Sequence, residues 1–218
     1  MKSSRPVQRP FVRVVGLTGG IGAGKSEALG YLASLGYPVL QADQVGHDLL
    51  RDPHFSKRIA VKFGGDILDR RGGVDRRKLG AVVFKSPTKR RALNQLLHPL
   101  IRGKIRQWVK KQQKSNPKPA LIALEIPLLF EGKGYPYLAG VLSVSASRAV
   151  RHRRLSARGW TSEEIRRREK GQWTPAQKDR QAHWVIRNNA SRRDLRRRLD
   201  AWLDGVLIRD GKRKSGEV

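Results

Sequence analysis

The residues of this chain best suited to chemistry form a glycine-rich run near the N-terminus, Gly19-Gly20-Ile21-Gly22-Ala23-Gly24-Lys25-Ser26. The run fits the phosphate-binding pattern G-x-x-x-x-G-K-[ST] and directly follows an apolar segment at residues 12–17. Glycine lets successive backbone N–H groups turn inward around a phosphate, where a Cβ would block the approach. Lys25 is expected to reach the β- and γ-phosphates, and the Ser26 hydroxyl is placed to ligate Mg²⁺. The run therefore predicts a site for a nucleotide triphosphate.

Strand and helix patterns alternate around this run. Short apolar segments predict strands near residues 11–17, 38–40, 120–124, 141–144 and 184–186. Helical patterns occupy residues 25–35, most of 47–113, the basic stretch 148–181, and 191–208. Strands that alternate with helices predict an α/β fold, in which a parallel sheet is flanked on both faces and ligands bind at the carboxyl ends of the strands.

Carboxylates that follow predicted strands are candidates for the proton transfer that a phosphoryl acceptor requires. An acceptor hydroxyl loses its proton as the phosphoryl group arrives, so a nearby carboxylate is the usual base. Asp43 follows the second predicted strand and suits this role, but it could equally cap the next helix, or do both. Glu125 could hold Mg²⁺ or face solvent, and Glu131 could bind substrate or cap a helix.

The basic stretch offers groups that could close over the phosphates and stabilise the charge of the transition state. Arg151, Arg154 and Arg158 are three and four residues apart, so they share one face of a helix. Most arginines of the stretch must face solvent because there are so many of them. His98, which precedes Pro99, is of a kind that is more often structural than a ligand.

Composition limits the remaining choices. The chain has 218 residues, no cysteine and a net charge of +29 at pH 7. The length suits one domain with an insertion, and the missing cysteine excludes disulfides and cysteine metal sites. Without an apolar run that could cross a bilayer or serve as a signal peptide, we expect a cytoplasmic protein with no membrane partner. The charge favours a solvated cationic surface, because its patches lack interleaved aromatic residues, but it leaves room for non-specific nucleic-acid binding.

Several sequence blocks, in the same order along residues 11–200, resemble dephospho-CoA kinases. The blocks are residues 17–26, Ala42-Asp43, Asp75-Arg76 with Leu79 and Phe84, Leu93-Asn94 with His98-Pro99, Pro127-Leu128-Leu129-Phe130-Glu131, Arg154-Leu155 with Arg158, Gln172, and Val185-Ile186 with Asn188. Many kinases share the phosphate loop, whereas the Pro-Leu-Leu-Phe-Glu and His-Pro blocks are specific to this family.

The resemblance implies transfer of the γ-phosphate of ATP, with Mg²⁺, to the 3′-hydroxyl of the dephospho-CoA ribose. It implies catalytic roles for Asp43 as the base, for Lys25 and for Arg154. The residues that it implies for ATP binding are Gly20, Ile21, Gly22, Ala23, Gly24, Lys25, Ser26, Glu27, Arg158 and Asn188. Those that it implies for acceptor binding are Thr18, Asp43, Arg76, His98, Leu129, Phe130 and Glu131.

The architecture implied by the resemblance is a three-layer P-loop kinase fold with a parallel sheet at its core. The kinase domain would span residues 11–205, with a helical acceptor-binding insertion at about 47–115 and a helical lid at about 148–178. A flexible basic tail at 1–10 and a basic C-terminal tail at 206–218 would flank it. The chain departs from the family at Gln41, where aspartate is usual, and at His47, where arginine is usual.

Two other functions remain open from the sequence. A small-molecule kinase of the nucleoside-monophosphate type would keep the loop and the lid but change the acceptor pocket. A phosphate-loop NTPase associated with nucleic acid would explain the positive charge, but not the Pro-Leu-Leu-Phe-Glu block.

Overall fold

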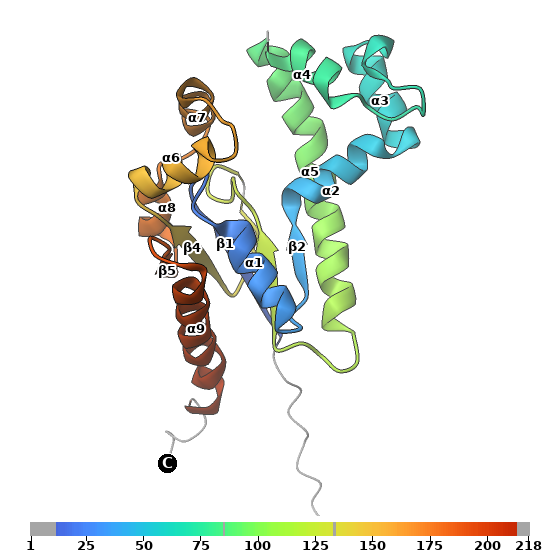
Figure 1. Ribbon diagram of the computed structural model, residues 1–218. Coiled ribbons are helices and arrows are strands. Elements are labelled where there is room, and N and C mark those ends of the chain that lie inside the picture. The colour runs from blue at the N-terminus through green and yellow to red at the C-terminus, as the bar shows by residue number, and fades with distance from the viewer. Residues whose placement is uncertain (1–11, 85, 133, 213–218) are drawn as a thin grey trace, which may run out of the picture. The chain divides into compact units, whose positions relative to one another are not determined.

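The computed structural model describes residues 12–84, 86–132 and 134–212 (Figure 1). The chain divides into two compact units. The first unit combines the N-terminal segment up to Val39 with the segment from Gln112 onward, and the second runs from Leu40 to Lys111. The tail predicted at residues 1–10 lies outside the described residues.

A five-stranded sheet with the order β2-β3-β1-β4-β5 runs through the described residues (Figure 1). Its strands are β1 (Arg13–Thr18), β2 (Val39–Gln41), β3 (Leu121–Glu125), β4 (Gly140–Ser145) and β5 (Trp184–Arg187). β1 pairs in parallel with β3 and β4, and β4 pairs in parallel with β5. Every residue of β3 and β4 is buried, as expected of strands covered on both faces. The glycine-rich loop therefore leaves the carboxyl end of the middle strand.

Helices cover both faces of this sheet. On one face, α1 (Lys25–Ser34) and α9 (Arg192–Lys212) share a core with the strands that includes Leu32, Leu142 and Trp202. α8 (Pro175–Gln181) contacts β4. Because the crossovers through α1 and α8 run in opposite directions along the sheet, right-handed connections place these helices on opposite faces. The basic stretch before β5 forms α6 (Arg148–Ser156) and α7 (Ser162–Glu169) as well as α8.

The second unit is helical. Its elements are α2 (Ala42–Arg51), α3 (Pro53–Phe63), the 3₁₀ turn η1 (Gly65–Ile67), α4 (Arg76–Phe84) and α5 (Pro87–Gln113), whose last two residues are assigned to the first unit. The unit has its own hydrophobic core, in which Ile59 and Ile67 are fully buried. Asp52 caps α3, since its carboxylate accepts two backbone N–H groups of the first turn at 2.9 and 3.2 Å. Asp75 accepts two such groups before α4, and these hydrogen bonds lower its pKa.

The α/β fold predicted from the sequence is confirmed, and each predicted strand occurs within two residues of its expected ends. α9 continues to Lys212, past residue 206, the predicted start of the basic C-terminal tail. Val206 accounts for the extension, since its side chain belongs to the buried core. The boundaries of the insertion and the lid stay predictions. No helix within the described ranges is long and apolar enough to span a membrane.

Two glycines allow a test of how tightly the phosphate loop is enclosed. Gly19 has a φ of +143°, and a Cβ there would lie 2.1 Å from the Val144 carbonyl oxygen, which cannot rotate away. Gly30 is exposed within α1, and no described atom lies within 4 Å of a Cβ added there. We expect Gly19→Ala to destabilise the fold by at least about 2 kcal/mol. Gly30→Ala should stabilise it by about 1 kcal/mol, because alanine is the better helix former.

Urea denaturation followed by circular dichroism measures both changes. A Gly19→Ala protein as stable as Gly30→Ala would contradict the close approach of the loop to β4.

Candidate active site

The phosphate loop joins β1 to α1 and is organised around the amino group of Lys25. Lys25 Nζ donates to the carbonyl oxygens of Gly19 and Gly20, each at 3.1 Å. Ser26 follows in the exposed first turn of α1. The unsatisfied N–H groups of that turn and the positive end of the helix dipole favour an anion at this point. The loop therefore has the polarity that a polyphosphate requires.

Two further glycines let other elements pack closely against the loop. Gly24 has a φ of +100°, and a Cβ there would lie 2.2 Å from Asn188 Nδ2. Gly22 has a φ of +74°, and its Cβ would lie 2.9 Å from the Arg151 carbonyl oxygen of α6. The glycine pattern is thus needed for packing against α6 and Asn188 as well as for the conformation of the loop.

Arg154 of α6 reaches the loop without a carboxylate partner. Its guanidinium donates to the Ala23 carbonyl oxygen at 3.4 Å and to Asn188 Oδ1 at 3.3 Å, both of them neutral acceptors. Partial burial and the nearby charges of Arg153 and Arg158 lower the pKa of Arg154. Among the described residues, no acidic side chain pairs with it. A half-buried cation with only neutral partners is suited to binding an anion such as phosphate.

The other two arginines on the predicted face behave differently. Arg151 is almost fully buried, and it donates to Glu169 Oε1 at 2.6 Å and to the Ile21 carbonyl oxygen at 3.2 Å. It therefore ties the loop to the end of α7 by a neutralised contact. Arg158 lies beyond the last residue of α6 and is exposed. The helical spacing predicted one face for all three, but only Arg151 and Arg154 contact the loop.

Asn188, directly after β5, is buried and fixed on two sides. Its Nδ2 donates to the Ala23 carbonyl oxygen at 2.8 Å, and its backbone N–H donates to Ser145 at 2.7 Å. The same side chain accepts a hydrogen bond from Arg154. The structure therefore brings Asn188, Arg154 and the phosphate loop together, as the predicted ATP site requires.

The segment after β3 contains three of the residues predicted to bind the acceptor. Leu129 is buried, and its side chain fills the space over Gly16 of β1. The Phe130 ring stacks on Trp173 with centroids 5.9 Å apart. Glu131 Oε1 accepts the backbone N–H of Trp173 at 2.7 Å and lies 3.1 Å from Lys178 Nζ. Nothing in the sequence patterns had pointed to Lys178, which is fully buried.

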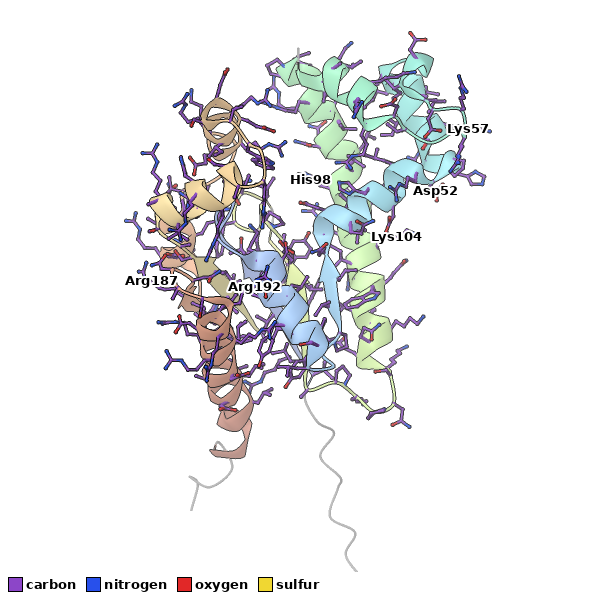
Figure 2. The ribbon with its side chains drawn as sticks, viewed as in Figure 1. Asp52, Lys57, His98, Lys104, Arg187 and Arg192 are labelled. Atoms are coloured by element: carbon purple, nitrogen blue, oxygen red, sulfur yellow. The ribbon has the colours of Figure 1, made fainter. Side chains whose placement is uncertain are left out.

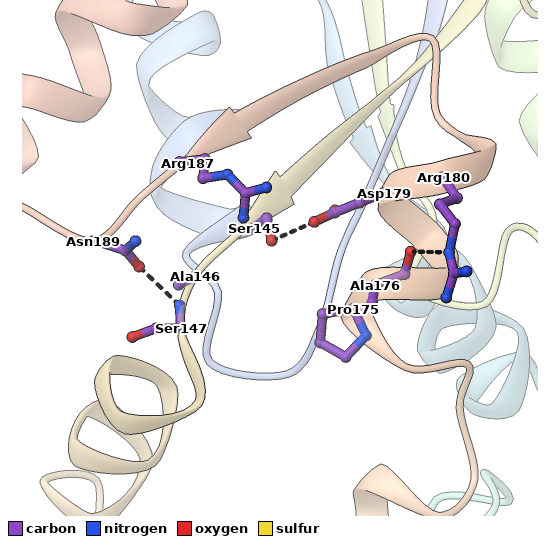
Figure 3. A pocket seen from close by; sticks show the side chains of 9 residues that line it. All are labelled: Ser145, Ala146, Ser147, Pro175, Ala176, Asp179, Arg180, Arg187 and Asn189. Carbon is purple, nitrogen blue, oxygen red and sulfur yellow. Dashed lines mark hydrogen bonds between the residues drawn. The ribbon is translucent and has the colours of Figure 1, made fainter.

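A hollow of about 430 Å³ lies at the carboxyl ends of β4 and β5 (Figure 3). Ser145, Asp179 and Arg187 line it, and the Ser145 hydroxyl donates to Asp179 at 2.7 Å. Pro175, another lining residue, would lie 2.9 Å from a Cβ added at Gly20. The first turn of α8 therefore stands against the phosphate loop.

Asp43 belongs to the second unit, where it lies exposed in the first turn of α2. The alternative that Asp43 is the N-cap is wrong, because the helix begins at Ala42 and Gln41 occupies the cap position. Partial burial lowers the pKa of His47, the positive charge of Arg76 lowers it further, and the carboxylate of Asp43 opposes both. Asp43 and Arg76 therefore both lie within electrostatic range of His47.

Two further predicted residues, His98 and Glu27, lie on different helices. His98 lies on α5 (Figure 2), where desolvation of its ring and the charge of Arg102 lower its pKa. Glu27 lies on α1 and pairs across to α9, with 3.5 Å to Arg192 and 3.8 Å to Arg196. Its carboxylate is therefore paired with α9.

The sheet carries a glycine-rich loop at the end of its middle strand, and an arginine without an acidic partner among the described residues packs against that loop. This arrangement is typical of phosphate-loop kinases. The sequence model of one such family, dephospho-CoA kinase, matches residues 13–194. The chain therefore belongs to the dephospho-CoA kinase family, which confirms the resemblance seen in the sequence blocks.

Individual relatives support this assignment over nearly the whole chain. A protein named dephospho-CoA kinase from Geobacillus kaustophilus (strain HTA426) is 39% identical over 191 residues, which cover 87% of this chain and 94% of the relative. A crystal structure from Thermus thermophilus is 34% identical, with a TM-score of 0.76. The match covers 90% of this chain and 98% of that chain. The structure of dephospho-CoA kinase from Campylobacter jejuni is 26% identical, with a TM-score of 0.71. The match covers 92% of this chain and 100% of that chain.

The neutral surroundings of Arg154 lead to a prediction. Lysine would keep the charge but lose the forked geometry that grips two oxygens at once. We expect Arg154→Lys to lower kcat/KM for ATP by about 10-fold or more. Arg166→Lys, on the exposed side of α7, should change it by less than about twofold. Steady-state kinetics with ATP as the varied substrate compares them, and equal losses would show that the Arg154 guanidinium has no special role at the phosphate loop.

Proposed function

We propose that this protein transfers the γ-phosphoryl group of ATP to the 3′-hydroxyl of dephospho-CoA, which yields coenzyme A and ADP. The observation that carries the proposal is the half-buried Arg154 guanidinium, held at the phosphate loop by neutral acceptors only. A chain of this family with such an arrangement is suited to bind a triphosphate and to stabilise charge during its transfer.

The loop and its neighbours divide the work on ATP. Lys25 exchanges its two carbonyl partners for phosphate oxygens, and the N–H groups at the start of α1 hold the same phosphates. Arg154 faces the phosphate chain, and Asn188 borders the base. Arg158, exposed beyond α6, reaches the phosphates only when the segment around it moves, as a lid would.

The acceptor side uses the other residues that the resemblance implies. Asp43 takes the proton of the 3′-hydroxyl as the phosphoryl group arrives. Arg76, whose charge acts on His47, supplies positive charge for the phosphates of the acceptor. Thr18, Phe130, Glu131 and His98 would contact the acceptor, and Leu129 would support the segment after β3 from the core.

The residues present fit a magnesium ion bound together with ATP. Ser26 offers one hydroxyl at the start of α1, and within the described ranges no cluster of three acidic, histidine or cysteine side chains forms a metal cage. Mg²⁺ keeps several waters and takes phosphate oxygens as ligands, so few protein ligands suit it. When bound, the ion neutralises part of the charge on the phosphates.

We place the reaction in the cytoplasm and treat polyanion binding as a by-product of charge. Arg192 and Arg197 of α9 each lie in an ion pair, but their side chains are 81% and 77% exposed and so stay accessible to a polyanion. Such binding should be weak and fall steeply with salt, because released counterions drive it.

A coupled ADP-release assay tests the function. Turnover with dephospho-CoA, little turnover with nucleoside monophosphates, and no stimulation by single-stranded DNA are the expected results. Preferred turnover of a nucleoside monophosphate would assign a different acceptor. Hydrolysis stimulated by DNA would assign a nucleic-acid NTPase.

Asp43 carries the most direct prediction for the chemical step. Asp43→Asn keeps the size of the side chain but removes its ability to take a proton, so we expect kcat to fall by roughly 10²–10⁴-fold. The KM for ATP should stay nearly constant, because Asp43 belongs to the acceptor side. Initial rates at saturating dephospho-CoA measure the change. An unaltered kcat would leave Asp43 no role as the base.

A further inference from the structure

Lys178 is a fully buried lysine in the middle of α8. Lysine is almost never buried completely without a partner, because its ammonium group loses its hydration. Burial lowers the pKa of Lys178, while the hydrogen bond and charge of Glu131 oppose the shift. A protein with so many exposed cations has no need of a buried one for solubility, so the position of Lys178 requires a specific reason.

The partners of Lys178 lie on the segment that follows β3. Its Nζ donates to the Pro127 carbonyl oxygen at 2.6 Å and lies 3.1 Å from Glu131 Oε1. The Pro127 carbonyl oxygen also accepts the Thr18 hydroxyl at 3.2 Å. Thr18 is the last residue of β1 before the phosphate loop. One ammonium group therefore joins α8, the segment after β3 and the base of the phosphate loop.

The Glu131 carboxylate is held on one side only. Oε1 pairs with the Lys178 ammonium group and accepts the backbone N–H of Trp173, whereas Oε2 is buried and has no hydrogen-bond partner among the described residues. A buried acceptor without a donor costs free energy, and a ligand that brings a hydroxyl or amide N–H removes that cost. The arrangement leaves one fixed acceptor for a donor from outside the chain.

We infer that Lys178 is a positioning residue of the kinase reaction, which fixes Glu131 and the Pro127 carbonyl so that Glu131 Oε2 accepts a hydrogen bond from the phosphoryl acceptor. The inference rests on the proposed function, because it assigns the acceptor to this segment. Lys178 touches neither substrate; it acts through Glu131 and through the backbone of Pro127.

The adjacent residue provides the comparison that separates positioning from simple anchoring. Asp179 accepts the hydroxyls of Ser143 and Ser145, each at 2.7 Å, and so attaches α8 to β4. Because this attachment does not involve Glu131, α8 has an anchor that is independent of Lys178. Loss of either residue should lower stability, but only loss of Lys178 should disturb the acceptor.

The experiment compares Lys178→Met, Asp179→Asn and the wild type by thermal unfolding and steady-state kinetics. Kinetics use whichever acceptor the wild type phosphorylates in the coupled assay, so a wrong acceptor assignment would not be mistaken for a failure of Lys178. We expect Lys178→Met to raise the KM for the acceptor at least about 10-fold, with the KM for ATP within about twofold. Asp179→Asn should lower the Tm and leave both KM values near those of the wild type.

Glu131→Gln keeps the shape of the side chain and provides a second measurement from the other partner. It should raise the same KM selectively, and the double variant should be no worse than the poorer single variant, because both changes break one unit. Unchanged acceptor KM in a folded Lys178→Met protein would overturn the inference. If that variant does not fold, an unchanged acceptor KM in Glu131→Gln overturns it, and a selective rise there supports it.

Discussion

The carbonyl oxygen of Ala23 accepts two side chains from distant parts of the chain, Asn188 Nδ2 at 2.8 Å and Arg154 at 3.4 Å. These contacts are possible only because Gly24 has no Cβ, which would lie 2.2 Å from the Asn188 amide nitrogen. The hydrogen bonds hold α6 and the end of β5 against the outside of the phosphate loop. The shape of the ATP site therefore depends on a backbone atom of the loop as much as on its lysine.

Three buried or half-buried cations around this loop are compensated in different ways. Arg151 is neutralised by Glu169, and Lys178 is neutralised by Glu131. Arg154 has only neutral acceptors among the described residues. The charge of a cation in a buried ion pair is already compensated, whereas a cation with neutral partners is stabilised most when an anion binds. The pattern of compensation, which net charge does not reveal, separates the two paired cations from the one suited to phosphate.

The sequence predicted the phosphate loop and the strands because these depend on local apolar runs and on a motif of fixed spacing. It grouped Arg151 and Arg154 with Arg158 because helical spacing shows a shared face, but spacing does not show where the helix ends. Lys178 was missed for a different reason. One lysine among many in a basic stretch carries no pattern, and its burial arises from contacts with residues about 50 positions earlier.

The departure at His47 shows how composition and site chemistry interact in the second unit. The resemblance implies an arginine at this position, which would carry a permanent charge beside Asp43. His47 does not replace that charge at neutral pH, because burial and Arg76 lower its pKa from a value already below 7. Arg51 and Arg76 still act on the same group. Two arginines therefore supply permanent positive charge at the position where the resemblance implies an arginine.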